Sequence, residues 1–508
     1  MPEVRTFPIL LLAGAILLSA SARAAVRKDI IVHGRDLLRV STADVWRNRG
    51  KFAAVGCDGV LMTLDRTLSD GSSAFGRDVL GDGTFHDAEF EESVRLAREC
   101  LASDGFRKSL ALVSLVPAER LAWTDDKAWM RAADNVGCYA RAARKAGFGG
   151  LAINKGLGVR MDQFRCLAGD PDLAEARRLA RERGRLFFVS LFRAFPDAKV
   201  LSLCLFDVEQ GELWVPFLNG LLDVIPPTAK LVDGNAPACR RAVGDADGYR
   251  ALASRTTGDA RELVAPENRA KYAVQVSVGF GLSVDAYDVT GEQDRRRFLR
   301  NLTDAASQAD ELVWIYGKRG TLIDWDAKGG EELREPTWES QFDGYARALR
   351  TAGGDLGWFR EGLQRGELRK LALEVRKGDA VGAFAFTNKN RTQRYTVGET
   401  LCPGDVVYVR FREKGRYPHL ALTWKSNEQT LLRRGSSEAR NEELIVPAAG
   451  TPDNEWRWID ARFVVPEGAD GLGLLAWGPL AHRHPLAFDA IECYRLSMPL
   501  ATWTQKDL

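Results

Sequence analysis

The sequence has little net charge and lacks the local motifs that mark nucleotide and cofactor sites. Its 71 lysines and arginines nearly balance its 69 aspartates and glutamates over 508 residues, which gives a formal charge of +2. This balance argues against a nucleic acid or an anionic membrane surface as partner, because both attract strongly basic proteins. No GxGxxG or phosphate loop follows the first predicted strand, and no GxSxG motif indicates a serine hydrolase.

Metal-binding patterns are missing as well. The five histidines form no HExxH motif, and the eight cysteines form no CxxC pair, which argues against a zinc site. We therefore predict neither a metal nor a cofactor. Two interpretations of the cysteines stay open: small buried apolar side chains, or one or two disulfides with Cys402 and Cys493 as the first candidate pair.

Residues 1–24 have the pattern of a cleaved signal peptide. Arg5 precedes an apolar run of about fourteen residues, and Ala22-Arg23-Ala24 provides a small-x-small cleavage site. The run is shorter than the roughly 20 residues that span a bilayer. We expect an exported protein, periplasmic or extracellular, that begins at Ala25 and has no membrane anchor after cleavage.

Residues 25–355 alternate short β-rich runs with longer helical stretches. The predicted strands lie at 29–33, 59–65, 109–115, 150–154, 199–207, 229–233, 272–280 and 311–317. Helices are predicted at 42–50, 87–102, 125–146, 172–195, 245–254, 292–309 and 339–351. Strands that alternate with helices in this number predict a (β/α)8 TIM barrel, an α/β fold, with a doubly wound open sheet as the alternative.

The texture changes after a predicted linker at residues 356–366. Residues 367–508 contain short runs rich in Val, Phe, Tyr, Trp and Thr, separated by Gly, Pro, Asn and Asp. This pattern predicts an all-β sandwich of antiparallel strands.

Candidate site residues follow from the barrel, because barrel active sites lie at the carboxyl ends of the strands. The residues that close each predicted strand, or open the loop after it, include His33, Asp65, Asn154, Lys155, Asp207, Glu209, Asp233, Asn235, Asp285, Trp314 and Tyr316. Carboxylates and aromatic rings around one mouth suit glycosidic bond cleavage, in which one carboxyl protonates the leaving oxygen and another attacks or activates water.

We predict Asp207 and Asp285 as the catalytic pair, with Asp233 in reserve, and the other residues as substrate contacts. The alternative for each aspartate is a structural one, since Asp at a strand end often caps a helix or holds a loop.

Several segments resemble a family of exported barrel proteins from polysaccharide-degrading bacteria that are classed as glycoside hydrolases. They include FAAVGCDGVLMTLDR, WMRAADNVGCYARAARKAGFGGLAIN, FLNGLLDVIPPTAKLVDGN and ADELVWIYG. The segments RFVVPEGADGLGLLAW and AFDAIECYRL resemble the end of a jelly-roll, carbohydrate-binding-like domain. The resemblance implies a glycoside hydrolase with a poly- or oligosaccharide as its partner.

The sequence departs from that family at the fourth strand. The family commonly places acidic residues there in a form like DxE, whereas this chain has Asn154, Lys155 and Gly156. Two hypotheses therefore compete: a hydrolase that uses carboxylates from strands five to seven, and a catalytically degenerate glycan-binding protein on the same scaffold. A structural envelope protein, with a mouth filled by loops, is a third.

Overall fold

The computed structural model describes the chain between Lys28 and Leu496, with gaps. The described residues are 28–155, 162–205, 211–236, 238, 246–287, 292–326, 333–342, 344–352, 369–375, 384–385, 392–402, 405–414, 419–426, 429–430, 442–445, 457–465, 468–477 and 487–496. Two compact units emerge, one of residues 28–353 and one of residues 354–508 together with 1–27. The predicted signal peptide and linker lie outside the described residues.

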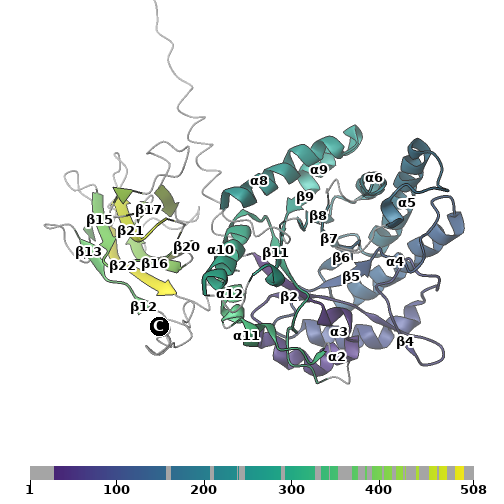
Figure 1. Cartoon of the computed structure of the whole chain (residues 1–508), viewed down its shortest axis with the longest axis horizontal. Helices are drawn as coiled ribbons and strands as arrows, with labels where there is room; N and C mark the ends of the chain where they lie inside the picture. The colour runs from purple at the N-terminus through teal and green to yellow at the C-terminus, as the bar shows by residue number, and fades with distance from the viewer. Residues whose placement is uncertain are drawn as a thin grey trace, which may run out of the picture. The chain divides into compact units, whose positions relative to one another are not determined.

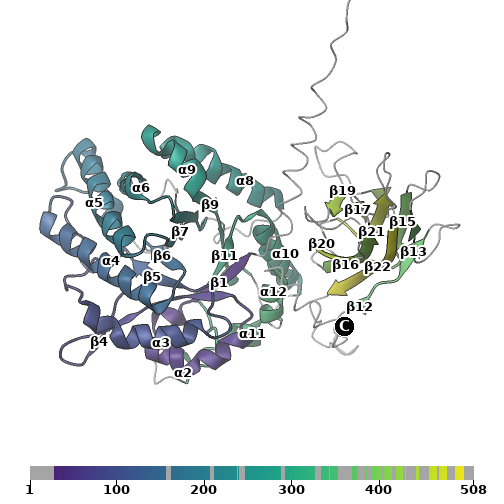
Figure 2. The same ribbon diagram turned by 180° about the vertical axis from the view of Figure 1, so that it is seen from behind.

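A parallel β-sheet forms the centre of the first unit, with helices around it (Figures 1 and 2). Its strands are β1 (Asp29–Gly34), β2 (Gly59–Met62), β5 (Leu110–Ser114), β6 (Gly150–Asn154), β7 (Lys199–Ser202), β8 (Lys230–Asp233), β9 (Val276–Val278), β10 (Phe280–Ser283) and β11 (Leu312–Gly317). The order is β10-β11-β1-β2-β5-β6-β7-β8-β9, and every pairing is parallel. Seven of the eight predicted strands coincide with these.

Gly279 joins the two ends of this sheet. It is the one residue between β9, which pairs with β8, and β10, which pairs with β11. Its N–H donates to the Asp233 carbonyl at 2.8 Å, and a Cβ here would lie 3.0 Å from Val232 Cγ1 and 3.2 Å from the Leu312 carbonyl oxygen. The two segments follow each other directly along the chain, so the sheet forms a nearly closed parallel barrel.

The prediction of a strand at 272–280 was wrong in its first half. Residues Arg269–Gln275 form helix α9. Tyr272 and Gln275 are buried three positions apart, while Val274 between them is 83% exposed, which is helical rather than alternating spacing. The strand therefore begins at Val276.

A helix follows each barrel strand, as the (β/α)8 prediction requires. The helices are α2 (Thr42–Asn48), α3 (Glu91–Leu101), α4 (Asp126–Ala146), α5 (Leu173–Ala194), α6 (Trp214–Val224), α8 (Ala246–Thr257), α9, α10 (Glu292–Gln308), α11 (Trp338–Gln341) and α12 (Tyr345–Ala352). A hairpin of β3 (Asp65–Thr67) and β4 (Ser73–Phe75) is inserted after β2.

Helix α6 was not predicted from the sequence. It packs against α5 at two glycines, where a Cβ on Gly184 would lie 2.1 Å from the Phe217 carbonyl and one on Gly220 would lie 2.2 Å from the Arg181 carbonyl. Its sequence, WVPFLNGLLDV, is short and contains Pro216 and Gly220, two residue types that disfavour a helix interior.

Apolar side chains fill the inside of the barrel. This interior cluster comprises Ile31, Leu61, Leu110, Leu112, Ala152, Leu201, Leu203, Cys204, Val232, Ala236, Leu312 and Trp314. Strand residues alternate between the two faces of a sheet, so these positions fix which neighbours face inward and which face the helices. The barrel is therefore a packed core with its open positions at the strand ends.

The second unit consists of two antiparallel sheets that share one core. One holds β12 (Arg369–Lys370), β14 (Phe384–Ala385), β16 (Val406–Lys414), β20 (Arg457–Val464) and β22 (Ala487–Leu496), and the other holds β13 (Leu373–Val375), β15 (Thr392–Val397), β17 (His419–Ser426), β18 (Gln429–Thr430), β19 (Glu442–Ile445) and β21 (Gly471–Trp477). Phe411 of the first sheet and Leu422 and Leu474 of the second belong to the same buried cluster. The jelly-roll connectivity stays a prediction.

No disulfide joins the cysteines that the structure describes. Cys402 is half-buried and Cys493 is fully buried, and the structure does not join them, so the disulfide alternative is not what the structure holds. Burial raises the pKa of the Cys493 thiol to about 12. Among the described residues, no helix has both the length and the apolar character needed to cross a bilayer.

Candidate functional site at the barrel mouth

A layer of uncharged polar side chains lies directly above the apolar barrel core. Each follows a member of the interior cluster by two residues on its strand, so strand alternation turns it toward the same inner side. The members of this polar layer are His33, Thr63, Ser114, Asn154 and Tyr316, at the ends of β1, β2, β5, β6 and β11. The first two are buried and the other three are half-buried. The mouth thus offers hydrogen-bonding groups over an apolar base.

His33 is a neutral member of this layer at neutral pH. Burial lowers its pKa from 6.5 to about 4, and the positive charge of Arg77 contributes to this shift. Its ring centroid lies 5.7 Å from that of Tyr316, and its Nδ1 atom is buried with no hydrogen-bond partner. The ring is therefore held as an imidazole beside an aromatic face.

Asp65 follows Thr63 by two residues, at the start of β3, and one of its two carboxylate oxygens is hydrogen-bonded. Its Oδ2 accepts the backbone N–H of Thr42 at 2.5 Å, which places the carboxylate at the start of α2, while Oδ1 is buried without a partner. Burial raises the pKa of Asp65 from 3.8 to about 6, although the hydrogen bonds from Thr42 oppose the shift. A carboxyl that titrates this close to neutrality fits a proton donor or acceptor.

Asp233 belongs to the helix-facing side of β8. Because Val232 points into the barrel, its neighbour points outward, where Thr256 of α8 donates to Asp233 Oδ2 at 2.9 Å. The backbone N–H groups of Leu205 and Asn235 donate to Oδ1 at 3.0 Å each. Burial raises the pKa of Asp233, opposed by these three bonds and by the charge of Lys155. The carboxyl group thus links the loop after β7 to α8 by hydrogen bonds.

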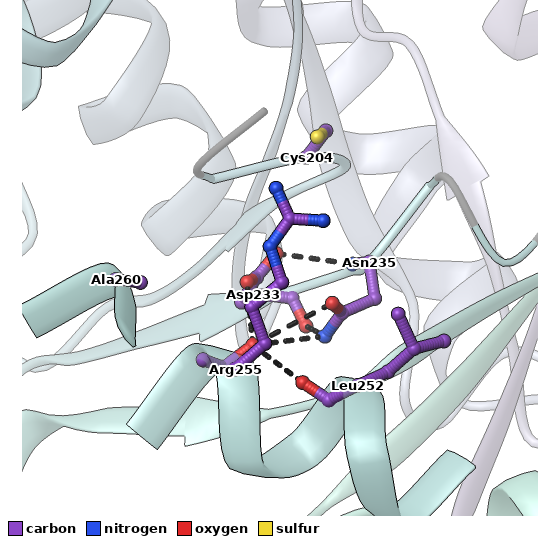
Figure 3. Close-up of a pocket in the computed structure, with 7 residues that line it drawn as sticks. Cys204, Asp233, Asn235, Leu252, Arg255 and Ala260 are labelled. Carbon is purple, nitrogen blue, oxygen red and sulfur yellow. Dashed lines mark hydrogen bonds between the residues drawn. The ribbon is translucent and has the colours of Figure 1, made fainter. Parts of the chain in front are cut away.

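Figure 3 shows the small pocket beside this carboxyl group. Its lining includes Cys204, Asp233, Asn235 and, from α8, Arg255 and Thr256. Asn235 has a left-handed backbone (φ 42°), and its Nδ2 donates to the Gly279 carbonyl at 2.9 Å, which ties β8 to the junction of β9 and β10. Both Asp233 and Asn235 are therefore hydrogen-bonded to other groups of the barrel.

Lys155 also lies on the helix-facing side, one residue beyond the inward Asn154. It is 2% exposed, and its Nζ lies 4.1 Å from the centroid of the Trp214 ring on α6. This is a cation–π contact in a desolvated setting. The lysine that stands where the resembled family has an acid is thus packed between strand and helix.

Trp314 fills the barrel below Tyr316. It is 1% exposed, and its Nε1 donates to the Gly234 carbonyl at 2.7 Å. A Cβ on Gly234 would lie 2.7 Å from that nitrogen, so glycine is what allows the indole this position. Of the two aromatic residues predicted on β11, Tyr316 is the one with exposed surface.

The other predicted carboxylates are placed differently. Asp285 is exposed in the short helix η9 (Val284–Ala286), and its two oxygens accept the backbone N–H groups of Lys318 and Arg319 at 2.7 and 3.1 Å. Asp207 and Glu209 lie outside the described residues. Within the described ranges, no three His, Cys, Asp or Glu side chains are grouped to hold a metal ion.

Sequence reasoning missed Thr63, Ser114 and Arg77. The first two would have been found by counting two residues beyond each inward apolar residue, Leu61 and Leu112. Arg77 follows the β3–β4 hairpin rather than a barrel strand, and its carbonyl accepts the Ser114 N–H at 2.8 Å. No local pattern marks such a position.

Comparison with known proteins assigns no family. No family model matches the chain, and no curated protein matches it. Solved structures that it resembles include a GH30 endoxylanase from Clostridium papyrosolvens C71 (TM-score 0.35, 11% identity, 90% of this chain and 97% of that one) and the cyclic α-maltosyl-(1→6)-maltose hydrolase of Arthrobacter globiformis (0.38, 12%, 84% and 89%). A D-allulose 3-epimerase from Methylomonas is similar to a smaller part (0.35, 12%, 66% and 99%). Because these scores are below 0.5, the fold rests on the strand order above.

Proposed function

We propose that this protein is an exported glycoside hydrolase that binds a poly- or oligosaccharide at the carboxyl-end mouth of its barrel. The observation that carries the proposal is the polar layer. Five neutral hydrogen-bonding side chains from five strands surround the mouth, with Tyr316 as the aromatic member. Sugar hydroxyl groups both donate and accept hydrogen bonds, and the apolar face of a sugar ring packs on an aromatic ring.

The chemistry we propose uses two carboxyl groups, as in most glycosidases. Asp207 and Asp285 stay the proposed pair, without an assignment of which is acid and which is nucleophile or base. Asp233 is the weaker candidate, since it faces α8 and accepts three hydrogen bonds. Asp65 joins the candidates as proton donor, because its pKa is raised to about 6 by burial and its Oδ1 has no partner.

The test is a polysaccharide panel on the full mature chain, with binding and reducing-end release scored together. We expect release by the wild type, loss of release with retained binding in an Asp207→Asn, Asp285→Asn double variant, and reduced release in Asp65→Asn. The matched control is Asp82→Asn, whose side chain is 93% exposed. Release that is unchanged in the double variant would remove that catalytic pair.

A glycan-binding protein without catalysis is the second candidate. It is favoured by one observation: the described carboxylates at the ends of β8 and β10, Asp233 and Asp285, are engaged by backbone N–H groups, while the fourth strand is followed by a buried lysine. Binding without release across the panel, equal in wild type and double variant, would support this function instead. In either case we propose that the second unit is an accessory carbohydrate-binding domain.

A further inference from the structure

Arg77 crosses the mouth beside the polar layer. Its carbonyl accepts the N–H of Ser114 at the end of β5, and its Nη1 donates to Thr63 Oγ1, beyond the end of β2, at 3.4 Å. Its charge also acts on the buried His33 ring of β1. The backbone of Arg77 is therefore tied to the end of β5, while its guanidinium lies beside the end of β2 and acts on the end of β1.

The guanidinium of Arg77 has few close partners although it is mostly buried. Its side chain is 15% exposed, and its nearest carboxylate, that of the 52% exposed Asp78, is 3.8 Å from Nε. The guanidinium carbon lies 4.1 Å from the centroid of the Phe75 ring. Burial lowers the pKa of Arg77, with the charge of Asp78 opposing the shift. A guanidinium has several N–H donors, and within the described residues most of these have no acceptor.

Other arginines of comparable burial in this unit are paired closely. Arg66, 11% exposed, donates to Glu89 at 2.7 Å. Arg120, 22% exposed, holds both oxygens of Asp170 at 2.9 and 2.6 Å. This is the usual arrangement, because desolvating a cation costs free energy that a carboxylate at hydrogen-bonding distance offsets. Arg77 has comparable burial, but its carboxylate neighbour Asp78 lies at 3.8 Å, beyond hydrogen-bonding distance, and is itself half exposed.

We propose that Arg77 binds an anionic group of the substrate, so that the glycan taken at the mouth is an acidic polysaccharide carrying carboxylate or sulfate groups. The planar fork of a guanidinium matches two oxygens of either group. The Nδ1 of His33, at the neighbouring strand end, is a second buried polar atom without a hydrogen-bond partner. The inference rests on the proposed function and adds the charge class of the sugar to it.

The test compares three polymers: polygalacturonate for carboxylate, a sulfated galactan for sulfate, and an unsubstituted galactan. Dissociation constants are measured by calorimetry for the full mature chain at one ionic strength. We expect one acidic polymer to bind at least about tenfold more tightly than the galactan. We expect Arg77→Gln to lose at least about tenfold of that affinity, a larger loss than the one it causes for the galactan. The acidic polymer whose affinity falls in Arg77→Gln shows whether Arg77 binds a carboxylate or a sulfate group.

Arg95→Gln is the control, because Arg95 is 54% exposed on α3 and pairs with Glu92 and Glu99. Arg77→Lys keeps the charge without the fork, should produce a smaller loss than Arg77→Gln, and carries the test if thermal melting shows that Arg77→Gln does not fold. Equal affinity for acidic and neutral polymers, or equal losses in Arg77→Gln and Arg95→Gln, would overturn the inference alone. Failure to bind or cleave any polymer would overturn the proposed function with it.

Discussion

Replacing Asp65 by asparagine should reduce the loss of barrel stability that accompanies a rise in pH. The folded protein holds this carboxyl 8% exposed with a pKa of about 6, against an ordinary value of 3.8. Well below pH 3.8 the group is protonated in both folded and unfolded chains. As the pH rises through 6, the folded chain must ionise a buried carboxyl that the unfolded chain ionises in water. The wild type therefore loses stability in this range.

The size of that loss follows from the shift. A rise from 3.8 to about 6 corresponds to about 3 kcal/mol at 1.36 kcal/mol per pKa unit. Asparagine keeps an oxygen for the Thr42 N–H and has no charge to bury. Burying the asparagine amide group where Oδ1 has no partner costs free energy, but this cost does not change with pH. Part of this shift is already present at pH 4, so the difference in unfolding free energy between variant and wild type should grow by about 2–2.5 kcal/mol in favour of the variant between pH 4 and pH 7.5.

The assay is urea unfolding of wild type and Asp65→Asn at about pH 4 and pH 7.5, monitored by tryptophan fluorescence. Asp82→Asn, at a 93% exposed position, should change the unfolding free energy by less than about 0.5 kcal/mol. A difference between Asp65→Asn and wild type that is the same at both pH values would refute the account of Asp65 as a desolvated carboxyl.

Three further substitutions test the fold around the site. Gly234→Ala should lower the unfolding free energy of the barrel, measured in urea, by about 1–3 kcal/mol, because its Cβ would lie 2.7 Å from Trp314 Nε1. Gly149→Ala is the control and should be close to neutral, since a Cβ at Gly149 would have no atom within 4 Å. His33→Gln should reduce the loss of unfolding free energy at low pH. Because the pKa of His33 is about 4 in the folded protein, the wild type loses about 2–3 kcal/mol of unfolding free energy as the pH falls from 7 to 4.5. Urea unfolding at both pH values measures this loss. Phe411→Ala should cost the second unit about 3–5 kcal/mol in calorimetry, since the ring is fully buried; a loss below 1 kcal/mol would contradict its core position.

The barrel was predictable because its signals are local. Helix α4 shows this: Asp125 caps its start by accepting the Ala128 N–H, and Gly147 ends it in a left-handed conformation, both visible as residue types in the sequence. Helix α2 begins in the same way, since Ser41 caps it through a capping box with Asp44. Helix α6 contains Pro216 and Gly220, which locally disfavour a helix, and it depends on contacts with α5, which no local pattern reveals.

The site was predictable only in part, because a strand end has two faces. The rule that barrel chemistry lies at strand ends selected His33, Asn154 and Tyr316, which the structure places in the polar layer. It also selected Lys155 and Asp233, which lie one residue away from an inward position and so face the helices. Assigning the face requires the register of the interior cluster, which depends on packing between segments far apart in the sequence.

The junction at Gly279 has a consequence for how this barrel fails. Since β9 pairs with β8, and β10 next to it along the chain pairs with β11, the seven other described barrel strands each have a neighbour on both sides. Loss of any β/α repeat would open the ring and expose two rows of unpaired backbone N–H and C=O groups, which act as templates for intermolecular strand addition. We therefore expect truncated barrels to aggregate rather than to persist as smaller folded proteins.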